Sequence, residues 1–255
     1  MKIEQTLRSA RDDGRKSLVI YLTAGVGPWK QALHEAAMAG ADVVEIGIPF
    51  SDPVMDGPVI QQACEQALEA GTTPESVLAD IAVLDAPCPL AVMTYYNLVF
   101  RFGLERFAAR CAAVGVSGAI LPDLPLIESA SWCEAADASD IETILLAATT
   151  SSDQRLSEIA QRCRGFVYGV GLLGVTGERD QLASSATEIA RRLKAVTDIP
   201  VLVGVGVSTP EQAVEACTIA DGVVVGSAVV RKLLDTGSAQ AVGELVGQFR
   251  QALDS

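Results

Sequence analysis

Short runs of apolar residues alternate along this chain with longer segments in which apolar residues recur every three or four positions. Runs of the first kind are typical of strands buried on both faces, and the second pattern is typical of amphipathic helices. Glycine, proline, aspartate and threonine mark most of the junctions. The alternation predicts repeated β–α units and therefore a parallel sheet.

Eight strands are predicted from the short runs. They cover Leu18–Thr23, Asp42–Ile48, Pro89–Tyr95, Gly118–Leu121, Glu142–Leu146, Gly165–Val170, Pro200–Val203 and Gly222–Val225. Helical segments such as Leu104–Ala113, Asp153–Arg162 and Ser184–Val196 lie between them. Eight strands favour a closed (β/α)8 TIM barrel over an open doubly wound sheet, whose G-x-G-x-x-G fingerprint does not follow the first strand.

No linker or compositional break divides the 255 residues, so we expect one barrel domain over residues 1–255. Two helical stretches, Val59–Ala70 and Pro74–Leu84, both fall between the second and third predicted strands. They indicate an extra helix inserted in an α/β barrel and not a second domain.

Composition narrows the possible partners. Hydrophobic residues make up 49% of the chain, which is enough for an extensive core. The formal net charge of −13 opposes binding to nucleic acid or to an anionic membrane. Because Met1–Arg15 mixes charges without an apolar run, and no later stretch is apolar enough to cross a bilayer, we expect a cytoplasmic protein.

The residue types that hold metals and cofactors are sparse. Six cysteines are scattered without a C-x-x-C pair, which predicts buried, reduced thiols. The single histidine, His34, is expected on the surface of a helix, which excludes a multi-histidine metal site. No lysine falls at the C-terminal end of a predicted strand, which argues against a Schiff-base enzyme. We therefore expect no metal and no cofactor.

The active site of such a barrel lies at the C-terminal ends of the strands, where the second strand carries a glutamate. Alternation puts Glu45 on the same face as Val43 and Gly47, toward the interior. Burial disfavours a charged carboxylate, so we expect Glu45 to have a raised pKa and to exchange protons near neutral pH. A structural glutamate paired with an arginine or a backbone amide is the alternative, and this pattern leaves both open.

The loop after this strand, Pro49–Pro58, contains three prolines and two aspartates. Prolines limit the freedom of the loop while the acids are presented at the barrel mouth. Asp56 is a candidate acceptor for a substrate N–H, or alternatively a turn former before Gly57.

Glycine-rich stretches follow the last three predicted strands, at Gly174–Gly177, Gly204–Gly206 and Gly226-Ser227. Glycines let backbone N–H groups approach an anion, and a short helix expected to begin at Ser227 adds its positive end. Barrels often place a phosphate site there. The residues together predict cofactor-free acid–base chemistry on a phosphorylated substrate.

Several motifs resemble the tryptophan synthase α subunit family. Glu45–Pro53 has the sequence EIGIPFSDP, and DGP follows at residues 56–58. The similarity continues in order along nearly the whole chain. Its further motifs are Tyr95-Tyr96-Asn97, Pro122-Asp123-Leu124-Pro125, Phe166-Val167-Tyr168, Gly174-Val175-Thr176-Gly177 and Asp221-Gly222 with Gly226-Ser227.

This resemblance implies a carbon–carbon lyase that cleaves indole-3-glycerol phosphate to indole and glyceraldehyde-3-phosphate in tryptophan biosynthesis. Glu45 would exchange protons at the indole C3 and the glycerol hydroxyl, Asp56 would hold the indole N–H, and Tyr168 would line the site near Glu45. The phosphate would bind at Gly177, Gly206, Gly226 and Ser227. The indole would lie among Ile60, Met93 and Ile120. The implied partner is a β subunit, in an α2β2 complex.

Some positions depart from the family pattern. Gly171 stands where a serine is common, Val205 stands where a phenylalanine is usual, and the early loop Gly25–Pro28 also differs. Loss of the aromatic wall at Val205 would change substrate affinity or indole packing, whereas the catalytic acids are intact.

Other interpretations share part of these motifs. A stand-alone lyase that releases free indole would keep the same acids and the same phosphate site. An idle subunit that only activates a β partner would be expected to lose Glu45 or Asp56. Another phosphate-binding barrel, such as an isomerase, would explain the glycines but not the loop Pro49–Pro58.

Overall fold

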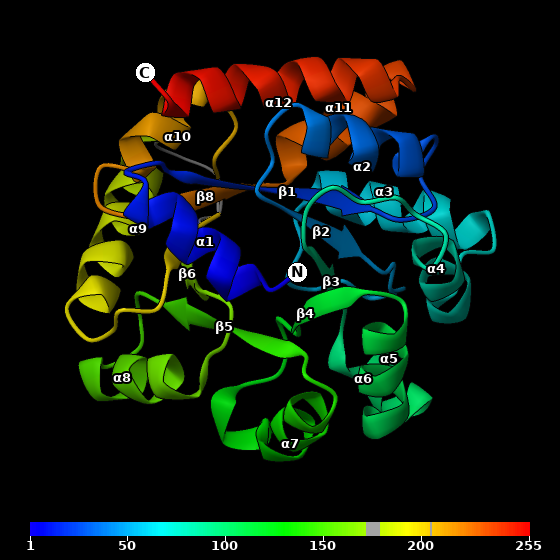
Figure 1. Cartoon of the computed structure of the whole chain (residues 1–255), viewed down its shortest axis with the longest axis horizontal. Helices are drawn as coiled ribbons and strands as arrows, with labels where there is room; N and C mark the ends of the chain where they lie inside the picture. The colour runs from blue at the N-terminus through cyan, green and yellow to red at the C-terminus, as the bar shows by residue number, and fades with distance from the viewer. Residues whose placement is uncertain (172–178, 205) are drawn as a thin grey trace.

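The computed structural model of the chain describes residues 1–171, 179–204 and 206–255. Its centre is a barrel in which eight parallel strands, β1 to β8, pair in chain order and β8 closes onto β1 (Figure 1). The strands are β1 (Ser17–Thr23), β2 (Val43–Gly47), β3 (Leu90–Met93), β4 (Val116–Ile120), β5 (Glu142–Ala148), β6 (Val167–Val170), β7 (Val201–Val203) and β8 (Gly222–Val225). The predicted (β/α)8 barrel is confirmed, and every predicted strand overlaps an observed one.

Helices surround the strands. They are α2 (Trp29–Met38), α3 (Pro58–Glu69), α4 (Pro74–Ile81), α5 (Tyr96–Phe102), α6 (Leu104–Ala113), α7 (Ala130–Ala138), α8 (Asp153–Arg162), α9 (Arg179–Lys194), α10 (Pro210–Ala216), α11 (Ser227–Thr236) and α12 (Ala239–Leu253), with a 3-10 turn η1 (Leu126–Glu128). Both α3 and α4 lie between β2 and β3, as predicted, and α2 carries His34 on its exposed side. The cysteines are free and all but Cys88 are buried. In the part of the chain that the structure describes, no helix is both long enough and apolar enough to cross a membrane.

The bounds of several elements differ from the prediction by a few residues, among them α9, which begins at Arg179 and not at Ser184, and β5, which continues to Ala148. The third strand ends at Met93, not at Tyr95, because the chain leaves the sheet there and begins helix α5 at Tyr96. Apolar and aromatic residues dominate on both sides of this junction, so the pattern hides the change from strand to helix.

Alternation along the strands fills the interior of the barrel in layers. A lower layer of buried side chains consists of Val19, Val43, Ala91, Ile144, Phe166, Leu202 and Val224. Two residues further along the strands, an upper layer surrounds a cavity and consists of Tyr21, Glu45, Met93, Ile120, Leu146, Tyr168, Gly204 and Gly226. The lower layer is therefore packed core, and the upper layer is the floor of a site.

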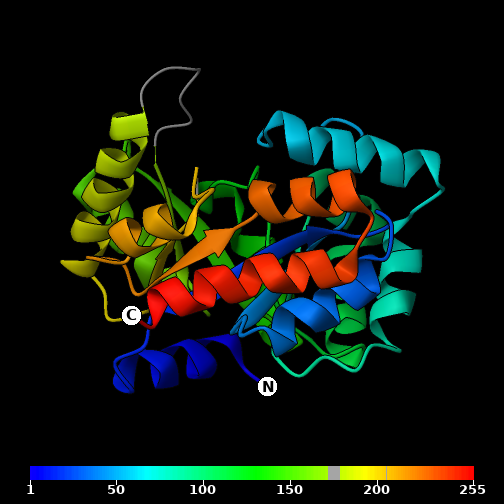
Figure 2. The same ribbon diagram turned by 90° about the horizontal axis from the view of Figure 1, so that it is seen from above.

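Helix α1 (Ile3–Asp12) closes the other end of the barrel, where the strands begin (Figure 2). Its Ile3 and Leu7 are fully buried against the lower layer. Gly118 on β4 makes room for Ile3, because a Cβ at Gly118 would lie 2.6 Å from the Ile3 Cδ1. The lumen is thus filled from below by side chains of α1.

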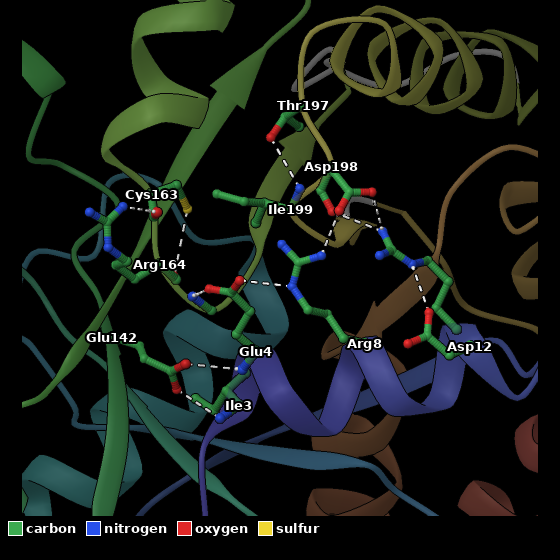
Figure 3. Close-up of polar contacts among 12 residues, drawn as sticks. Ile3, Glu4, Arg8, Asp12, Glu142, Cys163, Arg164, Thr197, Asp198 and Ile199 are labelled. Carbon is green, nitrogen blue, oxygen red and sulfur yellow. Dashed lines mark hydrogen bonds and ion pairs between the residues drawn. The ribbon is translucent and has the colours of Figure 1, made fainter.

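A buried carboxylate holds α1 in place. The Glu142 carboxylate accepts hydrogen bonds from the backbone N–H groups of Ile3, at 2.7 Å, and Glu4, at 3.0 Å (Figure 3). These N–H groups have no partner within the helix, so the carboxylate satisfies them and stabilises the positive end of the helix dipole. Arg8 adds ion pairs of 2.9 Å to Glu4 and 2.7 Å to the exposed Asp198.

Replacing Glu142 by alanine should therefore lower the free energy of unfolding by about 1–2 kcal/mol, as expected for loss of a helix cap. Equilibrium urea unfolding would measure the change. Asp198→Ala removes a surface ion-pair partner of the same helix, and we expect it to cost less than Glu142→Ala because water screens the exposed pair. Equal losses in the two variants would contradict the role of Glu142 as the cap of α1.

Candidate active site

A cavity of about 240 Å³ opens above the upper layer, at the C-terminal ends of the strands. Residues of the following loops and helices complete its wall, among them Met55, Asp56, Ile60, Pro122 and Ser227. The structure brings together around this one cavity the site residues expected from the sequence, apart from Gly177. Gly177 lies outside the described residues, as does Val205.

Glu45 enters the cavity from β2 and is only 1% exposed. Its Oε2 atom is buried without a hydrogen-bond partner among the described residues. Burial raises the pKa of Glu45 to about 8, and the nearby charge of Asp56 adds to this effect. The alternative of a structural glutamate with a buried partner therefore finds no support in this part of the chain. At neutral pH the side chain is a carboxylic acid that can donate a proton.

Asp56 lies in the loop between β2 and α3 and is half-buried at the cavity wall. Burial raises the pKa of its carboxyl to about 6, although a hydrogen bond from Tyr95 acts in the opposite direction. Asp56 is therefore mostly a carboxylate at neutral pH, where Glu45 is mostly neutral. One acid that can donate and one base that can accept thus share the cavity.

Tyr95, which follows β3, holds the Asp56 loop by three contacts. Its hydroxyl donates to Asp56 Oδ2 at 2.9 Å and accepts from the backbone N–H of Met55 at 2.9 Å. Its ring stacks on Phe50, with 5.0 Å between ring centroids. Because the hydroxyl oxygen already accepts from Met55, its proton is directed to Asp56, and the tyrosine favours the carboxylate form of that residue.

Two further tyrosines of the upper layer reach toward glycines on the next strand. A Cβ at Gly47 would lie 2.0 Å from the Tyr21 hydroxyl, and one at Gly204 would lie 2.4 Å from the Tyr168 hydroxyl. Burial raises the pKa of both tyrosines well above the ordinary value, and the charge of Glu45 contributes to each shift. Both remain neutral phenols, and their rings help to shape the cavity above the core.

The opposite wall contains the described residues that were expected to bind phosphate. Helix α11 begins at Ser227 with Gly226 as its N-cap, and no side chain caps its first turn. Its free N–H groups and the positive end of its dipole are suited to an anion. Gly206 has φ +86°, a conformation that favours glycine, and borders the same space. The described part of this wall presents backbone and not cationic side chains to the cavity.

The apolar part of the wall is formed by Ile60, Met93 and Ile120, as expected, and also by Leu146 and Val170. Ile60 and Ile120 are 7% and 1% exposed, and Met93 is half-buried. Such a surface suits a flat aromatic ring between the acids and the anion site.

Sequence reasoning did not assign roles to Tyr95 or Tyr21. Tyr95 appeared only as part of a motif, and no local signal connects its hydroxyl to a carboxylate 39 residues away in the chain. Tyr21 could have been found, because it lies two positions beyond Val19 on a predicted strand and so faces the lumen with it.

Comparison with known proteins shows which family the chain resembles. The family model described as tryptophan synthase alpha chain matches residues 7–252. A tryptophan synthase alpha chain of Streptomyces coelicolor is 46% identical, over 91% of this chain and 88% of that protein. One from Thermobifida fusca is 42% identical, over 98% of this chain and 96% of that protein.

Solved structures give the same result. A Mycobacterium tuberculosis tryptophan synthase structure superposes with a TM-score of 0.90 at 37% identity, covering 98% of this chain and 97% of the other. The tryptophan synthase alpha chain of Legionella pneumophila superposes with a TM-score of 0.87 at 32% identity, covering 100% and 98%.

The contacts of Tyr95 predict a measurable effect on Asp56. Since the Tyr95 hydroxyl lowers the pKa of Asp56, Tyr95→Phe should raise that pKa above its value of about 6. Carbon-13 NMR titration of the Asp56 carboxyl would measure the shift. Tyr96→Phe is the matched control, because the Tyr96 ring packs on Phe100 instead. An unchanged Asp56 pKa in Tyr95→Phe would contradict the assigned hydrogen bond.

Proposed function

Because the chain belongs to the tryptophan synthase alpha chain family, we propose that Glu45 and Asp56 carry out its reaction together. That reaction is the lyase step of tryptophan biosynthesis, in which indole-3-glycerol phosphate is cleaved to indole and glyceraldehyde-3-phosphate. The observation that carries the assignment is the pair of acids in one cavity, with the pKa of Glu45 at about 8 and that of Asp56 at about 6.

The proposed cleavage begins with proton transfer from the neutral Glu45 to C3 of the indole. This transfer places positive charge on the indole nitrogen, whose N–H donates to the Asp56 carboxylate. The Glu45 carboxylate then takes the proton of the glycerol hydroxyl next to the ring. The C–C bond breaks as the aldehyde forms, and its electron pair returns to the indole ring. Protons balance, because Glu45 ends the cycle in the form in which it began.

The other site residues are proposed to bind and orient. Tyr168 lies in the same layer as Glu45, and its ring would pack beside the reacting bond. Ile60, Met93 and Ile120 would hold the indole, and the phosphate would bind to the backbone at Gly206, Gly226 and Ser227 and at Gly177. The free first turn of α11 supports this placement, because phosphate binds readily at such a helix end.

We further propose a β subunit as partner, in an α2β2 complex in the cytoplasm. Three large apolar side chains are exposed near the mouth: Val54 is 79%, Phe100 64% and Ile127 74% exposed. They belong to the segments that follow β2, β3 and β4, so they lie at the same end of the barrel as the cavity. Several exposed large apolar side chains at one end of a barrel suit a protein interface. A partner covering them would also order the loop that carries Asp56.

Glu45→Gln tests the chemical proposal. The amide cannot transfer the proton, so we expect kcat for indole formation to fall by at least about 100-fold. We expect the free energy of unfolding to increase at the same time. A carboxyl with a raised pKa loses folded-state stability as pH rises from 4.5 to about 8, by up to about 1.4 kcal/mol per pH unit. Glutamine does not titrate, so its stability advantage should grow over this range.

Indole release and urea unfolding at several pH values would measure both effects. The exposed Glu65→Gln is the control, and we expect it to change neither quantity. Near parental turnover in Glu45→Gln would refute the assigned role, and a loss of turnover with a loss of stability would indicate a folding defect.

The partner proposal predicts that a β subunit raises the rate of indole release. Phe100→Asp puts a charge into the proposed interface. We therefore expect the β-subunit concentration needed for half-maximal activation to rise at least about tenfold. Val83→Asp is the control, since Val83 is 78% exposed but precedes β3, at the other end of the barrel. A high rate that stays flat across the β-subunit titration would favour the stand-alone lyase, and no rate with or without it would favour the idle subunit.

A further inference from the structure

A second, larger cavity of about 610 Å³ adjoins the active-site cavity. We call it the side chamber. The two cavities share four wall residues: Met55, Pro122, Leu146 and Val170. The side chamber then extends over the ends of β4, β5 and β6, away from Glu45 and from the phosphate wall. It is therefore continuous with the apolar part of the site.

A small residue at the end of β5 leaves this space open. Ile144, Leu146 and Ala148 follow one another on the lumen side of β5, and Ala148 lies in the chamber wall above Leu146. Gly171, directly after β6, contributes no side chain. A Cβ at Gly171 would lie 2.6 Å from the Oγ of Ser185 on α9, so a larger residue would point toward this helix and the Ser185 side chain would have to move. The departure from the family pattern at Gly171 is thus part of the chamber wall.

The far wall of the chamber is fixed to the body of the barrel. Arg192 of α9 donates to the backbone oxygens of Thr149, at 2.8 Å, and Ser151. It also pairs with Asp153, the first residue of α8, at 2.7 Å. Thr149 and Ser151 both line the chamber. These bonds hold the segment after β5 in place, so the space is a built part of the structure.

The position of the chamber identifies what it faces. In the proposed complex, Asp56 and Glu45 bind the five-membered ring of the indole from β2, and the phosphate binds at β7 and β8. The six-membered ring must then lie against the remaining wall, formed by Met93 on β3, Ile120 on β4 and Leu146 on β5. A group attached to that ring and directed away from Glu45 would pass Leu146 and enter the chamber.

We propose that the side chamber is a subsite for small apolar substituents on the six-membered ring, so that the chain also cleaves ring-substituted indole-3-glycerol phosphates. The wall near the opening consists of Pro122, Leu146, Ala148 and Val170, which suits a methyl group or a halogen atom. The proposal rests on the proposed function for the orientation of the ring.

The test compares indole-3-glycerol phosphate with four analogues that carry a methyl group on each free carbon of the six-membered ring in turn. For at least one analogue we expect kcat/KM within about tenfold of that of the parent substrate. Ala148→Leu fills the chamber and not the active-site cavity. In this variant kcat/KM for that analogue should fall at least about tenfold, while kcat/KM for the parent substrate should change less than about twofold.

Two further variants guard against indirect effects. Thr150→Phe fills the chamber from an exposed position and should act like Ala148→Leu, whereas the exposed Ala109→Leu on α6 should change nothing. Binding of indole and of the matching methylindole, followed by calorimetry, gives a readout that does not need turnover. The same selective weakening of methylindole is expected there.

The outcomes separate the two proposals. Failure of the wild-type chain to cleave the unsubstituted substrate would refute the proposed function, and methylindole binding would still test the chamber. If kcat/KM for all four analogues were more than about 100-fold below that of the parent substrate, the proposed subsite would be refuted. Equal effects of Ala148→Leu on substituted and unsubstituted ligands would refute it too.

Discussion

A closed barrel of parallel strands forces every second side chain of each strand into one narrow space, and most of this structure depends on how that space is filled. The lower layer fills it with large apolar groups such as Phe166 and Leu202. The upper layer cannot be packed in the same way, because Gly204 and Gly226 have no side chains and Glu45 is polar. The inward-facing residues of one layer are mostly large and apolar, and those two positions further along include glycines and a glutamate. This difference turns packed core into a cavity.

Glu45 places a carboxyl in the cavity, where burial makes its charged form unfavourable. Glu45 is 1% exposed, and its Oε2 has no partner among the described residues. A charge on this carboxyl would destabilise the fold, so the protonated form is favoured. The packed layer below and the helix α1 held by Glu142 supply compensating stability at a distance. Glu142 and Glu45 are both buried but differ in their partners, since Glu142 accepts hydrogen bonds from backbone N–H groups and Glu45 Oε2 has no partner among the described residues.

Features that depend on local periodicity and turn chemistry could be predicted from the sequence. Alternation of two placed Glu45 in the lumen, and a glycine before a helical pattern placed the start of α11 at Ser227, as the structure has it. The end of β3 was predicted wrongly, because the backbone and not the side-chain pattern decides where a chain leaves a sheet. The hydroxyl contacts of Tyr95 could not be predicted, since they depend on how two separate loops meet. The catalytic and binding roles themselves remain predictions.

The helix beneath the barrel has a consequence for molecular traffic. With Ile3 and Leu7 filling the lumen from below, the described barrel offers no passage through its axis, so the cavity is closed at its lower end. The reactant and both fragments must therefore pass on the side of the barrel where the strands end. Whatever shields that side controls entry and release at once, and the slowest of these exchanges sets an upper bound on turnover.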